Sequence, residues 1–85
     1  MYEVRYKKSV AKDFKKIGKA EAKKILKAIH TKLVNDPSGV GIPLKGKHGV
    51  IWRFRVGTYR VLYSFNKQEL WILVIHVAYR KEVYD

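Results

Sequence analysis

The sequence predicts an α+β domain with the element order β-α-α-β-β-β, in which two N-terminal helices pack on one face of an antiparallel sheet. Two patterns lead to this prediction. Apolar residues recur at helical spacing from residue 9 to residue 35, they alternate with charged residues, as in strands, in YEVRYKK and WRFRV, and they form further strand-length runs after residue 58. No linker or repeat interrupts the 85 residues, so a single domain is expected over residues 1–85.

The first half of the chain is predicted to hold one strand and two helices. In the segment YEVRYKK, aromatic and apolar residues alternate with charged ones, which is typical of a half-buried strand. Ser9 is expected to cap a first helix that ends at Gly18. A second helix is expected from about Lys19 to Asn35, because its apolar residues form one stripe, and Asp36–Pro37 should end it.

The second half is predicted to form three strands, in the segments VIWRFRV, YRVLYSF and LWILVIHV. The turns between them fall at Gly57–Thr58 and from Asn66 to Glu69. Because these connections are short, consecutive strands should be antiparallel neighbours. The last segment is apolar on both of its faces, so it should lie inside the sheet or be covered on both sides.

The charge of the chain points to a polyanionic partner. Nineteen Lys and Arg against seven Asp and Glu give a formal net charge of +12, and such a field attracts nucleic acid. An anionic membrane surface or an acidic protein would respond to the same charge. The lysines along the two helices are most simply a solvated surface, whereas four of the five arginines follow residue 52. Since the planar guanidinium suits bidentate phosphate contact, the site is expected in the C-terminal half.

Composition also excludes several classes of function. The absence of cysteine excludes disulfide frameworks, thiolate zinc sites and thiol nucleophiles, and no cluster of metal ligands is present. No apolar stretch reaches the roughly 18 residues of a membrane span, and the N-terminus does not resemble a signal peptide. A cytoplasmic protein is therefore expected.

Strand alternation brings the arginines together. Arg53 and Arg55 should lie on one face of a strand, about 7 Å apart along it. If the hairpin closes at Gly57–Thr58, Arg60 lies across from Arg55, and like charges so close destabilise a sheet unless an anion lies between them. Tyrosines in the neighbouring strands offer rings on which the bases of a single-stranded nucleic acid could stack.

The segment LKGKHGVIWRFRVGTYRVLYSF, followed by an apolar strand and by YRKEVYD, resembles the RelE branch of the RelE/ParE toxins of prokaryotic toxin–antitoxin modules. The shared pattern is a Leu-x-Gly, a basic strand of the WRFRVG type, a YRV-LY strand and a terminal Arg-x-x-Val-Tyr. It spans Leu44 to Tyr84, and the preceding strand and helices fit the family's element order. The resemblance implies an endoribonuclease that cuts mRNA in the ribosomal A site without metal or cofactor and is silenced by a co-expressed antitoxin.

The resemblance also implies a set of site residues. The family's catalytic positions fall on Arg53, Arg55, Arg60, Arg80 and Tyr84. Such an enzyme needs a general base to take the 2′ proton, and Tyr84 is the first candidate. Lowering a phenol pKa from about 10 to neutrality requires roughly 4 kcal/mol, for which nearby arginines are a plausible source. His76 has the strand parity of Arg80 and is the alternative base, although a buried, hydrogen-bonded histidine is the simpler interpretation.

The expected partners follow from the same resemblance. They are mRNA in the ribosomal A site, rRNA, and an acidic antitoxin that covers the site or displaces the C-terminal strand, with Lys45, Lys47 and Tyr79 as RNA contacts. The alternative function is that of a ParE-like toxin, which has the same fold and inhibits a protein target such as DNA gyrase without cutting RNA. Clustered phosphate ligands argue against this alternative, and a general RNA-binding module would leave the terminal Arg-Tyr pair unexplained.

Overall fold

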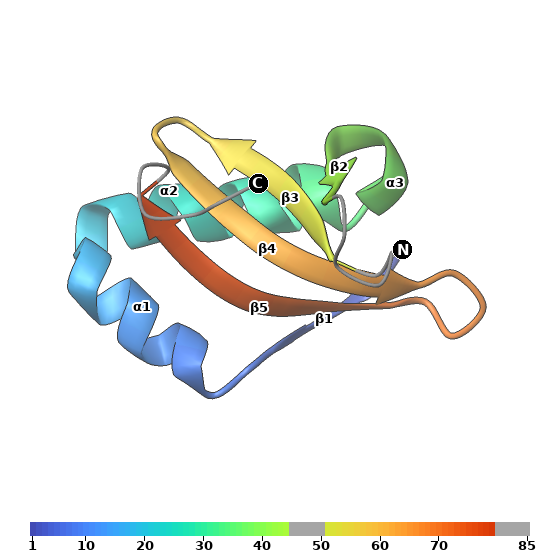
Figure 1. Cartoon of the computed structure of the whole chain (residues 1–85), viewed down its shortest axis with the longest axis horizontal. Helices are drawn as coiled ribbons and strands as arrows, with labels where there is room; N and C mark the ends of the chain where they lie inside the picture. The colour runs from blue at the N-terminus through green and yellow to red at the C-terminus, as the bar shows by residue number, and fades with distance from the viewer. Residues whose placement is uncertain (45–50, 80–85) are drawn as a thin grey trace.

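The computed structural model describes residues 1–44 and 51–79 of the chain (Figure 1). These residues form an α+β fold that begins with a strand, continues through helices and ends in strands, which confirms the predicted class. In chain order the elements are β1 (Glu3–Tyr6), α1 (Ser9–Ile17), α2 (Lys19–Ala28), the π-helical turn η1 (Ile29–Leu33), α3 (Pro37–Val40), β2 (Ile42–Pro43), β3 (Trp52–Val56), β4 (Tyr59–Asn66) and β5 (Trp71–Tyr79). None of the helices in this part of the chain has the length and apolar character needed to cross a bilayer.

The sheet is mixed rather than wholly antiparallel. Within the described residues it has the strand order β1-β5-β4-β3-β2. The strands β3, β4 and β5 are antiparallel neighbours as predicted, and β5 is interior as predicted, but β1 pairs with β5 in parallel. The prediction of an antiparallel sheet was wrong at this pair because two helices separate β1 from the later strands. No short turn then dictates its direction. The two-residue strand β2, beside β3, was not predicted.

The helices follow the predicted apolar stripes with some changes at their ends. Gly18 ends α1 with a φ of 101°, which a residue with a side chain would rarely adopt. Ser9 is not the cap: the capping position is Lys8, which has helical dihedrals and makes no side-chain cap bond. The second helix continues through η1 to Leu33, and the additional short helix α3 is capped by Asp36, whose carboxylate accepts from the Gly39 N–H at 3.1 Å.

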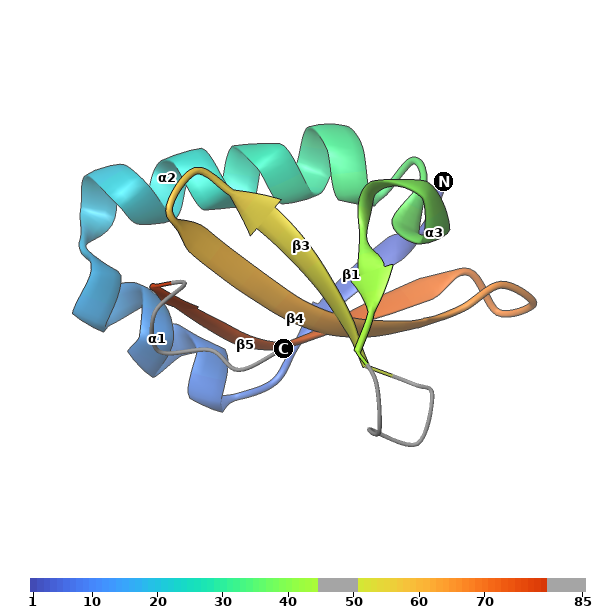
Figure 2. The ribbon, with the colours of Figure 1, turned by 45° about the horizontal axis from the view of Figure 1, so that its top comes forward.

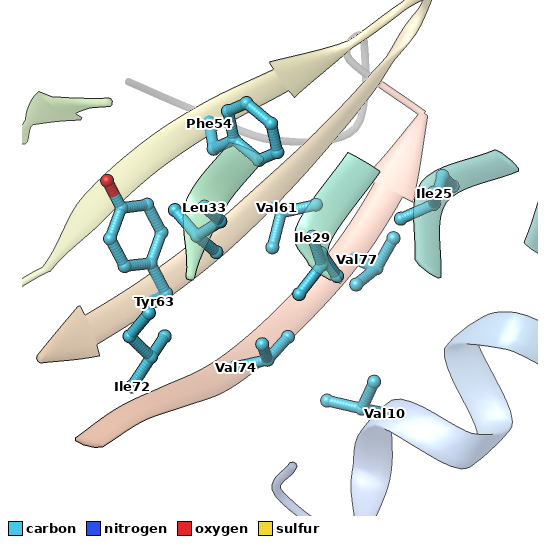
Figure 3. Close-up of a cluster of buried hydrophobic side chains, with 10 residues drawn as sticks. All are labelled: Val10, Ile25, Ile29, Leu33, Phe54, Val61, Tyr63, Ile72, Val74 and Val77. Carbon is cyan, nitrogen blue, oxygen red and sulfur yellow. The ribbon is translucent and has the colours of Figure 1, made fainter. Parts of the chain in front are cut away.

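The core lies between the helices and one face of the sheet. Figure 2 shows α2 crossing this face, while α1 lies beside β5 in both views (Figures 1 and 2). The buried cluster draws on every major element except β1 and is shown in Figure 3; it consists of Val10, Ile25, Ile29, Leu33, Phe54, Val61, Tyr63, Ile72, Val74 and Val77. Tyr63 is its one polar member, and its hydroxyl donates to the Pro37 carbonyl.

Two backbone features determine which side chains leave the core. The first is the tight turn between β3 and β4, where Gly57 has a φ of 59°; a glycine with positive φ at the first central position is the signature of a type II′ hairpin turn. The second is an irregularity in the β4–β5 pairing, where Leu62 pairs with His76 but Tyr63 pairs with Val74. The extra residue, Ile75, is a β-bulge. It shifts the alternation of β5, so that His76 and Ala78 lie on the face opposite the core.

Candidate functional site

Three arginines lie on the sheet face opposite the buried core, here called the arginine face. Residues that pair across a sheet share a face, so the register defines this surface. One row across the strands consists of Arg55, Arg60 and Ala78. The next row consists of Arg53, Leu62 and His76. The predicted juxtaposition of Arg53, Arg55 and Arg60 is therefore present in the structure.

Arg55 and Arg60 are held close together by the hairpin. The pair Val56–Tyr59 closes a two-residue turn, so Arg55–Arg60 is the next pair, of the closer, non-hydrogen-bonded type. In such a pair the Cβ atoms are about 4.5–5.5 Å apart. Arg55 is exposed, whereas Arg60 is only 8% exposed. Two guanidiniums on neighbouring strands make this part of the surface attractive to anions.

A shallow hollow of about 300 Å³ borders the arginines on the β2 side. It is lined by Val40, Ile42, Arg53 and Arg55. Val40 and Ile42 are large apolar residues that remain 37% and 55% exposed. The combination of apolar walls and two guanidiniums suits a ligand with a flat apolar part and a negative group, as a nucleotide has.

Tyr79 does not lie on the arginine face in this register. It pairs with Tyr59, which pairs with Val56, and this row faces the helices. The two tyrosine rings meet edge to face, with centroids 5.8 Å apart. Tyr79 remains 38% exposed at the end of β5, so any RNA contact it makes would be around the edge of the strand.

His76 is hydrogen-bonded to Asp13 of α1. His76 Nδ1 lies 3.0 Å from Asp13 Oδ2, and the same oxygen accepts the Val77 N–H at 3.0 Å. The predicted hydrogen-bonded histidine is thus confirmed, although it is only half-buried, with 44% of its side chain exposed. Both residues line a pocket of about 250 Å³ between α1 and the end of β5, together with Lys16, Tyr59 and Tyr79.

Asp13 is the residue that the sequence did not single out. It is the one acidic residue of α1, SVAKDFKKI, and an acid among lysines was the available signal. Its function depends on where α1 lies against β5, which periodicity cannot predict.

The remaining predicted residues are either outside the described part of the chain or structural. Lys45, Lys47, Arg80 and Tyr84 lie outside the described residues. His30 is structural, as expected, since its Nε2 lies 3.0 Å from the Tyr6 hydroxyl and joins the helix to β1; burial raises the pKa of Tyr6. Across residues 1–44 and 51–79, His, Asp and Glu do not gather into a group of three that could hold a metal ion.

Comparison with known proteins identifies the family of the chain. A family model described as the ParE toxin of the type II toxin–antitoxin system parDE matches residues 4–84. The fold is that of the RelE/ParE toxins, as the sequence predicted. Because the match covers nearly all of the chain, the chain belongs to this family of type II toxins. No curated protein matches the chain significantly.

Solved structures give the same fold. A chain of the toxin–antitoxin complex RelBE2 from Mycobacterium tuberculosis is 25% identical with a TM-score of 0.86, covering 93% of this chain and 98% of that one. A chain of the archaeal RelE–RelB complex from Pyrococcus horikoshii is 27% identical with a TM-score of 0.70, covering 96% and 98%. The intact RelBE complex of E. coli, at 18% identity and a TM-score of 0.74 over 93% and 96%, is similar in fold alone.

Proposed function

We propose that this toxin is a ribosome-dependent mRNA endoribonuclease that acts without a metal ion. The observation that supports the proposal most strongly is the direct opposition of Arg55 and Arg60, with Arg53 in the adjacent row of the same face. A protein that only needs a stable sheet gains nothing from paired cations there. An enzyme that must hold a phosphate whose charge grows in the transition state gains a great deal.

The reaction is the attack of a 2′-hydroxyl on the adjacent phosphorus. It leaves a 2′,3′-cyclic phosphate and a 5′-hydroxyl, and it needs a base, an acid and cations around the pentacoordinate phosphorus. The arginines supply the cations because guanidinium stays protonated at every physiological pH. Arg80 and Tyr84, which the resemblance assigns to the same site, would complete it from the C-terminal segment.

The proposed partners of the toxin are polyanions. mRNA in the ribosomal A site and rRNA fit the net charge of +12, with Lys45 and Lys47 as further contacts. The solved relatives from M. tuberculosis and P. horikoshii are toxin–antitoxin complexes. We expect a cognate antitoxin with an acidic segment that neutralises the arginine face.

A second candidate function is inhibition of a protein target such as DNA gyrase without RNA cleavage. The description of the matching family, as the ParE toxin of parDE, favours it. On this alternative the arginine face would bind a protein surface, and no group in it would need to transfer a proton.

One experiment separates the two functions. The toxin is induced in cells, transcript 5′ ends are mapped, and purified protein is assayed for inhibition of DNA supercoiling by gyrase. New 5′ ends within translated codons, with gyrase unaffected, support the nuclease. Gyrase inhibition without new 5′ ends would replace the proposed function by the alternative.

A matched pair of variants makes this test specific. Arg55→Gln and Arg5→Gln remove the same charge. Arg5 pairs with Leu73 across the sheet, roughly 15 Å along β5 from the site, and there it forms an ion pair with Glu3 at 3.0 Å. Arg55→Gln should lower cleavage by about a hundredfold, as the loss of one transition-state charge contact does, and Arg5→Gln should cleave as the wild type.

A further inference from the structure

The edge of β5 changes its neighbour halfway along the strand. Within the described residues β1 pairs with β5 from Trp71 to Val74, and beyond the bulge at Ile75 the strand edge faces α1. An unpaired strand N–H needs an acceptor when it is removed from water. Asp13 supplies it, since its Oδ2 accepts from Val77 N–H at 3.0 Å. The carboxylate is therefore anchored by the backbone, with only 17% of its side chain exposed.

The anchored carboxylate also orients the His76 ring. The ring nitrogen Nδ1 lies 3.0 Å from the same oxygen. A carboxylate only accepts hydrogen bonds, so Nδ1 carries the hydrogen, and in the neutral ring Nε2 is left as the proton acceptor. This is the arrangement by which an acid residue sets the tautomer of a catalytic histidine.

The oriented histidine lies on the arginine face. His76 pairs with Leu62, and Arg60 is two residues before Leu62 on β4, so His76 and Arg60 are diagonal neighbours on one surface. Diagonal neighbours are about 7–8 Å apart, with their Cβ atoms somewhat closer. A phosphate bound at the Arg55–Arg60 pair would therefore have its neighbouring 2′-hydroxyl on the same surface as the imidazole.

We propose that His76 is the general base of the cleavage reaction and that Asp13 is its positioning residue. This inference rests on the proposed function and deepens it. His76 Nε2 takes the proton of the 2′-hydroxyl, O2′ forms the bond to phosphorus, and the bond from phosphorus to O5′ breaks. The leaving oxygen takes a proton from water, and the imidazolium later returns its own proton to water. An imidazole can accept a proton near neutral pH, whereas a phenol would first have to lose one, at a cost of about 4 kcal/mol.

The surroundings of the ring contain further groups that titrate or carry charge. The pocket that His76 and Asp13 share also holds Lys16 from α1, Tyr59 from β4 and Tyr79 from β5. Arg60 is the nearest cation of the arginine face by register. Lysine and tyrosine ionise at higher pH than imidazole. The contribution of His76 to the pH dependence of the cleavage rate is therefore obtained by comparing the wild type with His76→Gln.

The test is single-turnover cleavage of ribosome-bound mRNA between about pH 5.5 and 8.5, the interval in which imidazole changes its charge. The wild-type rate should rise with pH. His76→Gln keeps a polar side chain for Asp13 and should cleave about 10²–10⁴-fold more slowly, as loss of a general base does, with the rise abolished. Asp13→Asn keeps an acceptor for the Val77 N–H and should cut at least about tenfold more slowly. Added imidazole should restore part of the activity of His76→Ala.

His30→Gln is the matched control, because His30 is a histidine whose partner is Tyr6 rather than a site residue, and it should leave rate and pH profile unchanged. Asp13 and His76 could instead only hold α1 against β5. In that case His76→Gln and Asp13→Asn will have lower melting temperatures but will cleave at the wild-type rate per folded molecule, which would overturn the inference. An unchanged pH profile in His76→Gln would also overturn the role of His76 as general base, but it would leave the proposed nuclease function intact. A wild-type protein that fails to cleave in this assay would contradict both the role of His76 and the nuclease function.

Discussion

Replacement of Arg55 by glutamine should make the protein more stable while it weakens the site. Arg55 is exposed and faces Arg60 in the closer kind of antiparallel pair. If the two guanidiniums splay to about 7 Å, their repulsion is roughly 0.6 kcal/mol in water and roughly 2.4 kcal/mol at an effective dielectric constant of about 20. Because Arg55 is exposed, the lower value applies, and we expect the free energy of unfolding to rise by about 0.5–1 kcal/mol.

The assay is urea unfolding of the purified toxin in low salt and again in about 1 M salt, where the screening length falls to about 3 Å. The gain in Arg55→Gln should be present in low salt and lost in high salt. Arg5→Gln, which removes an exposed ion pair with Glu3, should be neutral or slightly destabilising in low salt. A lower stability of Arg55→Gln than of the wild type in low salt would show that the two arginines do not repel, and it would contradict an anion site there.

Binding of RNA should reverse the difference in stability between the wild type and Arg55→Gln. A ligand that binds only the folded protein stabilises it by about 2.7 kcal/mol at a hundred times its dissociation constant. A short single-stranded RNA with a non-cleavable 2′-deoxy linkage should therefore raise the melting temperature of the wild type more than that of Arg55→Gln. Equal shifts in the two proteins would place the RNA elsewhere on the surface.

Three further changes test the packing that supports the site. Tyr63→Phe removes the donor to the Pro37 carbonyl and should cost about 1–3 kcal/mol in urea unfolding; a neutral result would show that the bond contributes nothing. Burial and nearby Asp36 raise the pKa of Tyr63, so the folded state keeps a proton that the unfolded state loses above about pH 10. Wild-type stability should then fall by up to about 1.4 kcal/mol per pH unit from this group, and Tyr63→Phe should fall less steeply. Gly41→Ala would place a Cβ 1.9 Å from the Tyr63 hydroxyl and should destabilise by about 1–3 kcal/mol, whereas unchanged unfolding would mean that the contact relaxes freely. Leu70 is 47% exposed and has a φ of 57°, a left-handed conformation that is strained for a residue with a side chain. Leu70→Gly should therefore raise the free energy of unfolding by up to about 1–2 kcal/mol. A drop in the melting temperature would show that the packing of the leucine outweighs this strain.

The arginine face could be predicted from the sequence because its determinants are local. Alternation puts Arg53 and Arg55 on one face, and a two-residue turn at Gly57–Thr58 leaves a single register for Arg60. Both rules act over a few residues, and the predicted juxtaposition was correct.

The Asp13–His76 pair could not be predicted in the same way. It depends on a bulge at Ile75 that no glycine or proline marks, and on β1 ending at Tyr6, which leaves the rest of the β5 edge to α1. Each is a consequence of tertiary packing rather than of local propensity. The parallel direction of β1 was missed for the same reason.

The most direct test of the central claim, that the arginine face cleaves RNA through the 2′-hydroxyl, is the cleavage of two ribosome-bound mRNAs that differ by one oxygen. The first is all ribose, and the second carries 2′-deoxyribose at the nucleotide before the cut. We expect the first mRNA to yield a 2′,3′-cyclic phosphate and a 5′-hydroxyl, and the second to stay intact while the toxin still binds it. Cleavage of the deoxy mRNA, or of neither mRNA, would contradict cleavage through the 2′-hydroxyl.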